Sequence, residues 1–159
     1  MSEFGQRFVI DTNALVHLGR HRRASRFFLE NAVIPEEVMY EASGIPDITY
    51  LGSNVHPTTA SVLHWLTTVM STVPSEDTRL VDLYANKGNA DPLVVACALD
   101  GQERDSHMLI RPEWVVVTAD EAVRKKAREF ELTVLSNSEF VAVIDSNSSG
   151  VSGQFLGSA

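Results

Sequence analysis

Short apolar runs that do not alternate with polar residues recur along this chain. A run of this kind predicts a strand that is buried on both faces, as in a parallel sheet, because an alternating pattern would be expected if one face met water. Each run is followed within a few residues by a proline, an asparagine or an acidic residue, which indicates where the strand ends. The predicted strands are residues 8–10, 33–34, 115–117 and 132–135.

Segments with apolar positions spaced three or four apart lie between these runs and predict helices. Proline stands at or near the start of several of them, which favours the first turn of a helix. The helix from residue 91 is apolar nearly all round, so we expect it to be deeply buried. Residues 44–57 and 100–112 are polar and predict loops. The predicted helices are residues 14–19, 25–32, 35–41, 57–70, 74–84, 91–99, 121–130 and 136–145.

Strands that alternate with helices predict an α/β domain with a mostly parallel central sheet. At 159 residues the chain is long enough for one hydrophobic core. We expect this domain to span residues 1–145. Residues 146–159 are rich in Ser and Gly and predict a flexible tail.

The apolar runs are well below the roughly 20 residues that a membrane-spanning helix needs. The N-terminus has no basic segment followed by an apolar stretch, so it does not resemble a secretory signal. Cys97 is the only cysteine and lies in an apolar helical run, which favours a buried core residue in a reducing compartment. We therefore expect a cytoplasmic protein.

The formal net charge of −8 argues against a nucleic-acid binder, because phosphate affinity usually requires excess Lys and Arg. The distribution of the 13 basic residues changes this picture, since eight of them lie in two short runs. Taken alone, each run is also what a solvated helix face looks like. The two runs are Arg20, Arg22, Arg23 and Arg26, and then Arg124, Lys125, Lys126 and Arg128.

Four acidic residues stand out by their position. Asp11 directly follows the first strand, and Asp120 lies three residues after the strand at 115–117. The carboxyl ends of parallel strands lie along one edge of a sheet, so we expect these two acids at the same edge. Asp91 begins the buried helix and Glu41 ends the helix from residue 35. If both helices pack beside that edge, four carboxylates converge.

Such a cluster opposes folding, because like charges raise one another's pKa, and a bound divalent cation relieves the repulsion. Carboxylate oxygens without Cys or His select Mg²⁺ or Mn²⁺. A water on that ion can attack a phosphodiester bond.

Each acid also has a purely structural explanation. Asp91 precedes a proline, as a helix N-cap does, and Asp120 could cap the helix that follows it. Asp11 could be an ordinary turn residue. Glu41 could be a solvated helix residue, with Glu37 one turn earlier as a competing candidate. The functional interpretation therefore depends on all four occurring together.

Four segments resemble the motifs of PIN-domain ribonucleases. Residues 8–15 (FVIDTNAL) are similar to the family's opening strand and turn, and residues 34–41 (IPEEVMYE) to its second motif. Residues 89–98 (NADPLVVACA) resemble the third motif, in which an Asp opens an Ala-rich helix. Residues 116–120 (VVTAD) resemble the fourth, a strand that ends in Thr-x-Asp. The resemblance spans about residues 8–145.

This resemblance implies a PIN-like three-layer fold and a metal-dependent endoribonuclease. Among bacterial chains of this size, the commonest such ribonucleases look like VapC-type toxins, which a cognate antitoxin neutralises and which usually form homodimers. Asp11, Glu41, Asp91 and Asp120 carry over as ligands of Mg²⁺ or Mn²⁺, directly or through water, and Asn13 and Thr118 as groups that orient them. Two departures from the family are an apparent insertion at residues 100–112 and the Ser/Gly-rich tail.

Under this interpretation both basic runs flank the metal site and bind the RNA backbone. The residues expected to contact RNA are Arg20, Arg22, Arg23, Arg26, Arg124, Lys125, Lys126 and Arg128.

Other functions fit the sequence less well. A non-catalytic PIN-like module that binds RNA or a protein is the main alternative, although it would tend to lose the acids. A receiver-type phosphotransfer domain needs adjacent acids after the first strand, and a phosphatase with Asp-x-Asp there fails at Asn13. His17 and His21 have a spacing used in zinc sites, but no third ligand lies nearby in the sequence. A globular domain whose four acids are incidental caps remains open.

Overall fold

The computed structural model describes residues 5–74, 76 and 91–152, and for Asp91 and residues 149–152 it describes the backbone alone. Within this part of the chain, five strands form one sheet in the order β3-β2-β1-β4-β5, and every neighbouring pair is parallel. The predicted α/β class with a parallel central sheet is therefore confirmed. The strands are β1 (Gln6–Ile10), β2 (Ala32–Pro35), β3 (Val55–His56), β4 (Glu113–Val117) and β5 (Thr133–Leu135).

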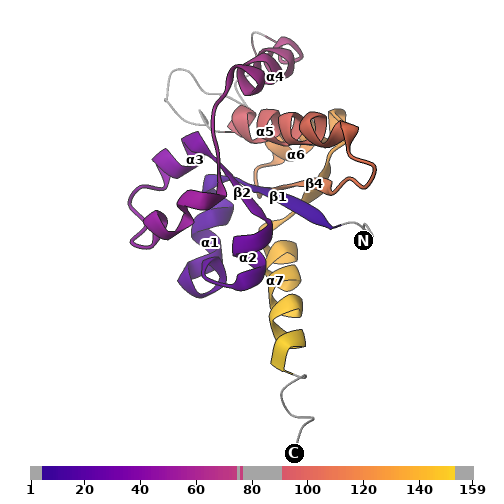
Figure 1. The fold of residues 1–159 in the computed structure, drawn as a ribbon. Helices are drawn as coiled ribbons and strands as arrows, with labels where there is room; N and C mark the ends of the chain where they lie inside the picture. The colour runs from indigo at the N-terminus through magenta and orange to yellow at the C-terminus, as the bar shows by residue number, and fades with distance from the viewer. Residues whose placement is uncertain (1–4, 75, 77–90, 153–159) are drawn as a thin grey trace, which may run out of the picture.

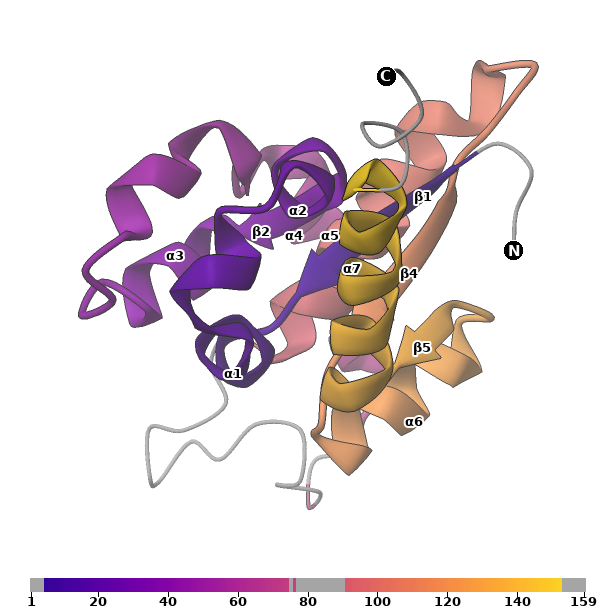
Figure 2. The ribbon, with the colours of Figure 1, turned by 90° about the horizontal axis from the view of Figure 1, so that it is seen from below.

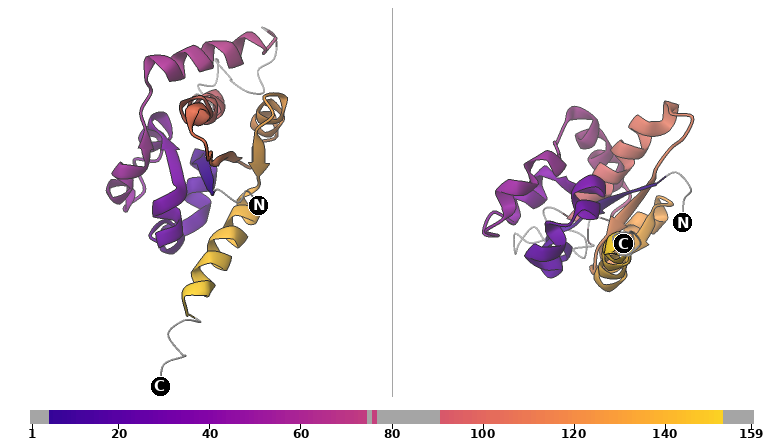
Figure 3. Two further views of the ribbon diagram at one scale, coloured as in Figure 1. Left: turned by 45° about the vertical axis from the view of Figure 1, so that its right-hand side comes forward. Right: turned by 60° about the horizontal axis from the view of Figure 1, so that its bottom comes forward.

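Helices cover both faces of this sheet and make three layers. Below the sheet lie α1, α2 and α7, and above it lie α5 and α6, with α4 packed outside α5 (Figures 1, 2 and 3). The helical segments are α1 (Thr12–Arg23), α2 (Arg26–Asn31), α3 (Glu36–Glu41), η1 (Ile48–Asn54), α4 (Ala60–Ser71), α5 (Asp91–Arg104), η2 (Asp105–His107), α6 (Glu121–Glu129) and α7 (Asn137–Ser152).

The core fills the space on each side of β1 and β4. Phe8 of β1 lies 4.9 Å from Phe140 of α7 between ring centroids, and Phe28 of α2 lies 6.4 Å from the same ring. On the other face, α5 buries Val94 through Ala98 completely or almost so, as its apolar sequence predicts. Burial on both faces explains why the strand sequences show no alternation.

The strand order reverses beside β1. From β1 the chain winds outward through β2 and β3, and it then returns to place β4 on the other side of β1. Register pairs Ile10 with Val117, so both strands end at the same level. A crevice outside the carboxyl ends of the strands forms at such a point, and ligands bind there in open α/β sheets.

Two elements differ from the sequence-based expectation. Residues 44–57 were expected to form one loop, but they contain η1 and the short strand β3, which pairs with β2. Residues 100–112 were expected to be irregular, but α5 continues to Arg104. Asp100 lies in that extension, is 1% exposed and forms hydrogen bonds with His56 and Ser61. A segment with a polar sequence therefore contains a carboxylate that is buried and hydrogen-bonded.

The end of the chain also differs from the expected tail. The helix α7 runs to Ser152, so residues 146–152 are helical. Side chains of Ser146, Asn147 and Ser148 donate hydrogen bonds to carbonyls one turn earlier, so their polar groups are satisfied within the helix. Residues 153–159 lie outside the described residues, as do residues 75 and 77–84 of the helix expected at 74–84. None of the described helices has both the length and the apolar content that crossing a membrane requires.

Candidate functional site

Asp11 lies at the carboxyl end of β1 and is the N-cap of α1. Its Oδ1 accepts a hydrogen bond of 2.7 Å from the Ala14 amide, and its Oδ2 accepts the hydroxyl of Thr118. The residue is only 4% exposed. It therefore combines the capping role that its position allows with a burial that is unusual for a carboxyl group.

Burial raises the pKa of the Asp11 carboxyl above its ordinary value, because the charged form is desolvated. The hydrogen bonds from Thr118 and Ala14 lower the pKa and offset part of this effect. The negative charges of Asp120 and Glu41 raise it further. Asp120 and Glu41 thus both lie close enough to Asp11 to act on it electrostatically.

Thr118 connects the ends of the two central strands. It is completely buried, and its hydroxyl donates to Asp11 while accepting the backbone amide of Asp120 at 3.0 Å. Asp120 in turn caps α6, since its Oδ1 accepts the Val123 amide at 3.1 Å. One hydroxyl therefore fixes the position of Asp120 relative to Asp11, and Asp120 keeps an exposed carboxylate.

Glu41 reaches the same region from the end of α3. Its Oε2 accepts the hydroxyl of Thr12 at 2.6 Å, which ties α3 to the first turn of α1. Asn13, the next residue of α1, accepts a 3.1 Å hydrogen bond from the side chain of Asn137 at the start of α7. The side-chain amide oxygen (Oδ1) of Asn137 is buried and has no hydrogen-bond partner among the described residues. Nothing in the sequence pattern singled out Asn137, because a polar residue that begins a helix is unremarkable.

A pocket of about 540 Å³ opens between these groups at the end of β1 and β4. It lies at the topological switch point, where the fold is expected to hold a ligand. Its lining residues are Asp11, Thr12, Asn13, Val16, Ala119 and Asp120.

Part of the predicted metal site falls outside the described residues. Asp91 begins α5, as the sequence predicted, but its side chain lies outside the described part of the structure. Among the side chains that are described, no three His, Cys, Asp or Glu residues are grouped closely enough to hold one ion directly. The oxygen donors of Asp11, Asp120 and Glu41 suit a hard cation that keeps part of its water shell, as Mg²⁺ does.

The basic runs divide into internal and surface residues. Arg23 is 5% exposed and donates to both carboxylate oxygens of Asp47, at 2.8 and 2.9 Å. Lys126 is 8% exposed and lies 2.7 Å from Glu129. The guanidinium of Arg23 and the ammonium of Lys126 are therefore engaged inside the fold, contrary to the expectation that the whole of each run faces RNA.

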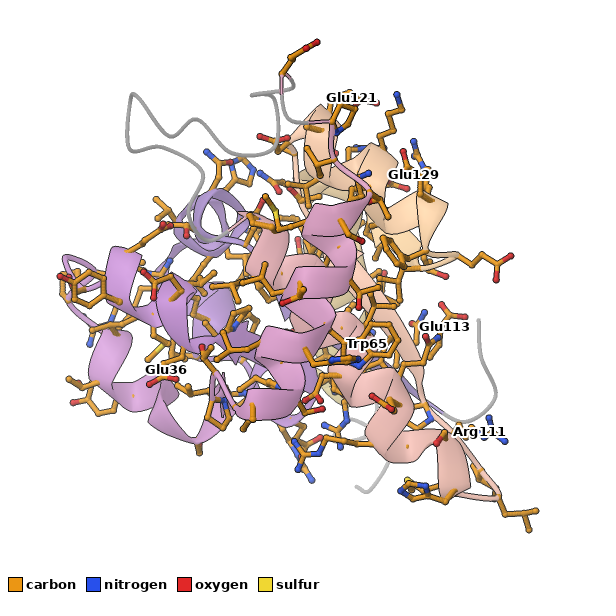
Figure 4. The ribbon with its side chains drawn as sticks, turned by 90° about the horizontal axis from the view of Figure 1, so that it is seen from above. Glu36, Trp65, Arg111, Glu113, Glu121 and Glu129 are labelled. Atoms are coloured by element: carbon orange, nitrogen blue, oxygen red, sulfur yellow. The ribbon has the colours of Figure 1, made fainter. Side chains whose placement is uncertain are left out.

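The remaining basic side chains keep some exposure. Arg22 and Arg26 form surface ion pairs with Asp145 and Glu30, at 3.0 and 2.6 Å. Arg124 is 22% exposed and lies 3.9 Å from Glu121 of α6, a residue labelled in Figure 4. Arg20, Lys125 and Arg128 are exposed, and none of them forms an ion pair with another described residue.

The zinc alternative loses its geometric basis. Gly19 has φ of 77° and ψ of 162°, which interrupts α1 between His17 and His21. The two side chains therefore do not share the helical face that a spacing of four residues requires.

Comparison of the chain with models of protein families and with curated proteins found no match.

Proposed function

We propose that this chain is a metal-dependent ribonuclease that hydrolyses RNA phosphodiester bonds at the Asp11 pocket. The observation that carries this proposal is the burial of the Asp11 carboxyl at the switch point, which raises its pKa, with the charges of Asp120 and Glu41 adding to the rise. A cap alone needs neither the burial nor the repulsion, since capping aspartates are well tolerated at exposed positions. A site that binds a cation explains both.

The cation, Mg²⁺ or Mn²⁺, would supply positive charge that stabilises the phosphate in the transition state, and it would lower the pKa of a bound water. Asp11, Glu41, Asp91 and Asp120 would hold it, at least in part through water. Thr118 fixes the separation of Asp11 and Asp120, and Thr12 orients Glu41. Asn13 lines the pocket with its side-chain oxygen held by Asn137, which leaves its NH₂ group to donate to a phosphate oxygen.

The substrate backbone must be attracted to a chain of net charge −8. Exposed Arg20, Lys125 and Arg128 supply local positive charge from the two helices that start at the pocket, α1 and α6. Binding through phosphate contacts of this kind weakens steeply with salt. The resemblance to VapC-type toxins adds the finer proposal that a separate antitoxin protein neutralises this activity.

The test compares cleavage of a mixed RNA panel by the wild type with cleavage by Asp11→Asn, Asp120→Asn and Asp91→Asn, each with Mn²⁺ or Mg²⁺ and with EDTA. Asn caps helices nearly as well as Asp, so these variants remove charge and keep the capping bonds. The matched control is Glu113→Gln, which removes one carboxylate at the opposite end of β4 and keeps the acceptor for Gln6. We expect metal-dependent cleavage that all three Asp variants lose and Glu113→Gln retains.

Melting temperature with and without Mn²⁺ provides a second measurement that does not need activity. The ion should raise the melting temperature of the wild type and of Glu113→Gln, and of Asp11→Asn much less. Metal stabilisation and RNA binding without cleavage would favour a non-catalytic RNA-binding module. The absence of both cleavage and metal stabilisation would refute the proposal.

A further inference from the structure

An aromatic side chain stands in solvent next to the acids of the Asp11 pocket. Tyr40 lies in the last turn of α3 and is 77% exposed. It directly precedes Glu41, whose carboxylate accepts the hydroxyl of Thr12 at 2.6 Å. The backbone is fixed here, because the carbonyl of Tyr40 accepts the amide of Ser43 at 3.2 Å. A large exposed ring is therefore held within one residue of a carboxylate that acts on Asp11.

A second exposed apolar side chain lies in the pocket itself. Val16 of α1 lines the pocket and is 55% exposed. It follows Thr12 by four residues, so the two side chains share one face of the helix. Thr12 bonds to Glu41 from that face, and α1 packs against α3 (Figure 1). Val16 and Tyr40 therefore border the same side of the pocket, and we call these two residues the apolar border.

Exposure alone does not distinguish Tyr40, because Tyr50 of η1 is also 77% exposed. Its position does. Apart from Ala119 and Val16, the side chains that line the pocket are polar or acidic, which suits a phosphate and its cation. A nucleobase is flat and neutral, with apolar faces, so a chain of net charge −8 does not repel it. The base next to a phosphate in the pocket requires an apolar surface close by, and the apolar border supplies one.

We propose that the apolar border binds an unpaired base of the RNA substrate, with the base stacked on the ring of Tyr40. Stacking on an aromatic side chain tolerates any base, because every base has a π-face. A base inside a duplex is already stacked on its neighbours and is not free to bind in this way. The substrate is therefore single-stranded. This inference rests on the proposed function, since it requires an RNA phosphate in the Asp11 pocket.

The test is the cleavage of a single-stranded RNA by the full chain with Mn²⁺, with KM and kcat measured separately. Tyr40→Ala should raise KM about 10-fold, because one stacking contact is lost. The value of kcat should change little, since that contact is equally strong in the bound substrate and in the transition state. Tyr40→Phe keeps the ring and should keep the wild-type KM. The matched control is Tyr50→Ala, which removes an equally exposed tyrosine from another element and should leave KM unchanged.

The same RNA sequence in a duplex separates stacking from a structural effect. Tyr40→Ala should leave the KM for the duplex as it is in the wild type, because the paired base does not reach the ring. An equal loss with both substrates would show a general disturbance of α3 and would overturn the proposal. An unchanged KM for the single strand would overturn it as well.

Binding of a fluorescently labelled single-stranded RNA, measured by anisotropy with Mg²⁺, distinguishes this proposal from the nuclease activity. If the wild type binds the RNA without cleaving it, the nuclease proposal alone fails, and Tyr40→Ala should still weaken binding about 10-fold. If the wild type cleaves RNA and Tyr40→Ala binds it equally well, the base subsite alone fails. A wild type that binds no RNA would overturn both proposals.

Discussion

Replacement of Arg23 by Met should destabilise the fold strongly, although Arg23 belongs to a basic run that looks like a surface feature in the sequence. The side chains of Arg23 and Asp47 are 6% and 9% exposed. Arg23 also donates to the carbonyl of Leu15 at 2.8 Å. Met preserves most of the side-chain volume but leaves the Asp47 carboxylate buried without its partner.

The expected loss is about 3 kcal/mol in the free energy of unfolding. Breaking a buried ion pair by removing one member costs about 3–5 kcal/mol, and the lower end applies because both side chains keep a small exposed fraction. For a domain of this size, 3 kcal/mol corresponds to a fall of about 6–12 °C in melting temperature. The pKa of Asp47 is held below its ordinary value of 3.8, first by the hydrogen bond from Arg23. The pair therefore stabilises the fold above pH 3.8, and this contribution is lost as the pH falls through the folded pKa.

Urea unfolding followed by circular dichroism measures this effect, and Arg22→Met is the matched control. Arg22 also makes a bidentate pair, with Asp145 at 3.0 Å for both bonds, but those side chains are 36% and 53% exposed. Surface pairs contribute little, so the control should unfold almost as the wild type does. Equal stabilities of Arg23→Met and Arg22→Met would refute the reasoning. The wild-type excess stability over Arg23→Met should also shrink below pH 3.8.

Three further predictions concern the site and the core. In EDTA, the stability of the wild type relative to Asp11→Asn should rise as the pH falls through the raised folded pKa of Asp11. The reason is that the folded state binds more protons in this pH range than the unfolded chain does. A difference in unfolding free energy between the two proteins that does not change with pH, measured by urea titration, would contradict this. Gly101→Ala should lower the free energy of unfolding by about 1–3 kcal/mol and shift the tryptophan fluorescence, because the added Cβ would lie 2.3 Å from the ring of Trp114. Unchanged unfolding would show that the ring is free to move. Asp100→Ala should lower the free energy of unfolding by about 3 kcal/mol, because it leaves the buried His56 without its hydrogen-bond partner at 2.8 Å. A loss below about 1 kcal/mol in urea unfolding would argue that the hydrogen bonds of Asp100 are dispensable.

Two elementary rules were enough to predict where Asp11 and Asp120 lie. Each acid follows an apolar run, and parallel strands end at one edge of a sheet, so their proximity did not depend on knowing the strand order. The order itself, with β4 beside β1, is a property of long-range pairing that local periodicity does not contain. The bond between Thr118 and Asp11 depends on that pairing, since their strands are neighbours only in space.

The elements that the sequence did not predict share a physical cause. The strand β3 has two residues and exists because Val55 pairs with Ile34, which is a tertiary contact. Asp100 and Arg23 are charged, and a sequence pattern places charged residues at the surface by default. Each is buried because a partner distant in the sequence compensates it, and such partners become visible only in the folded chain.

The bond that joins Thr118 to Asp11 spans 107 positions, and this has a consequence for how the protein is made. Ribosomes add about 5–20 residues per second, so roughly 5–20 s pass between synthesis of the first acid and synthesis of the threonine that holds it. During that interval β1 lacks β4, its partner on one side, and the pocket lacks one wall. A nascent chain released early would carry Asp11 without Asp120, and any activity of this pocket would begin only after the second half of the sheet has folded.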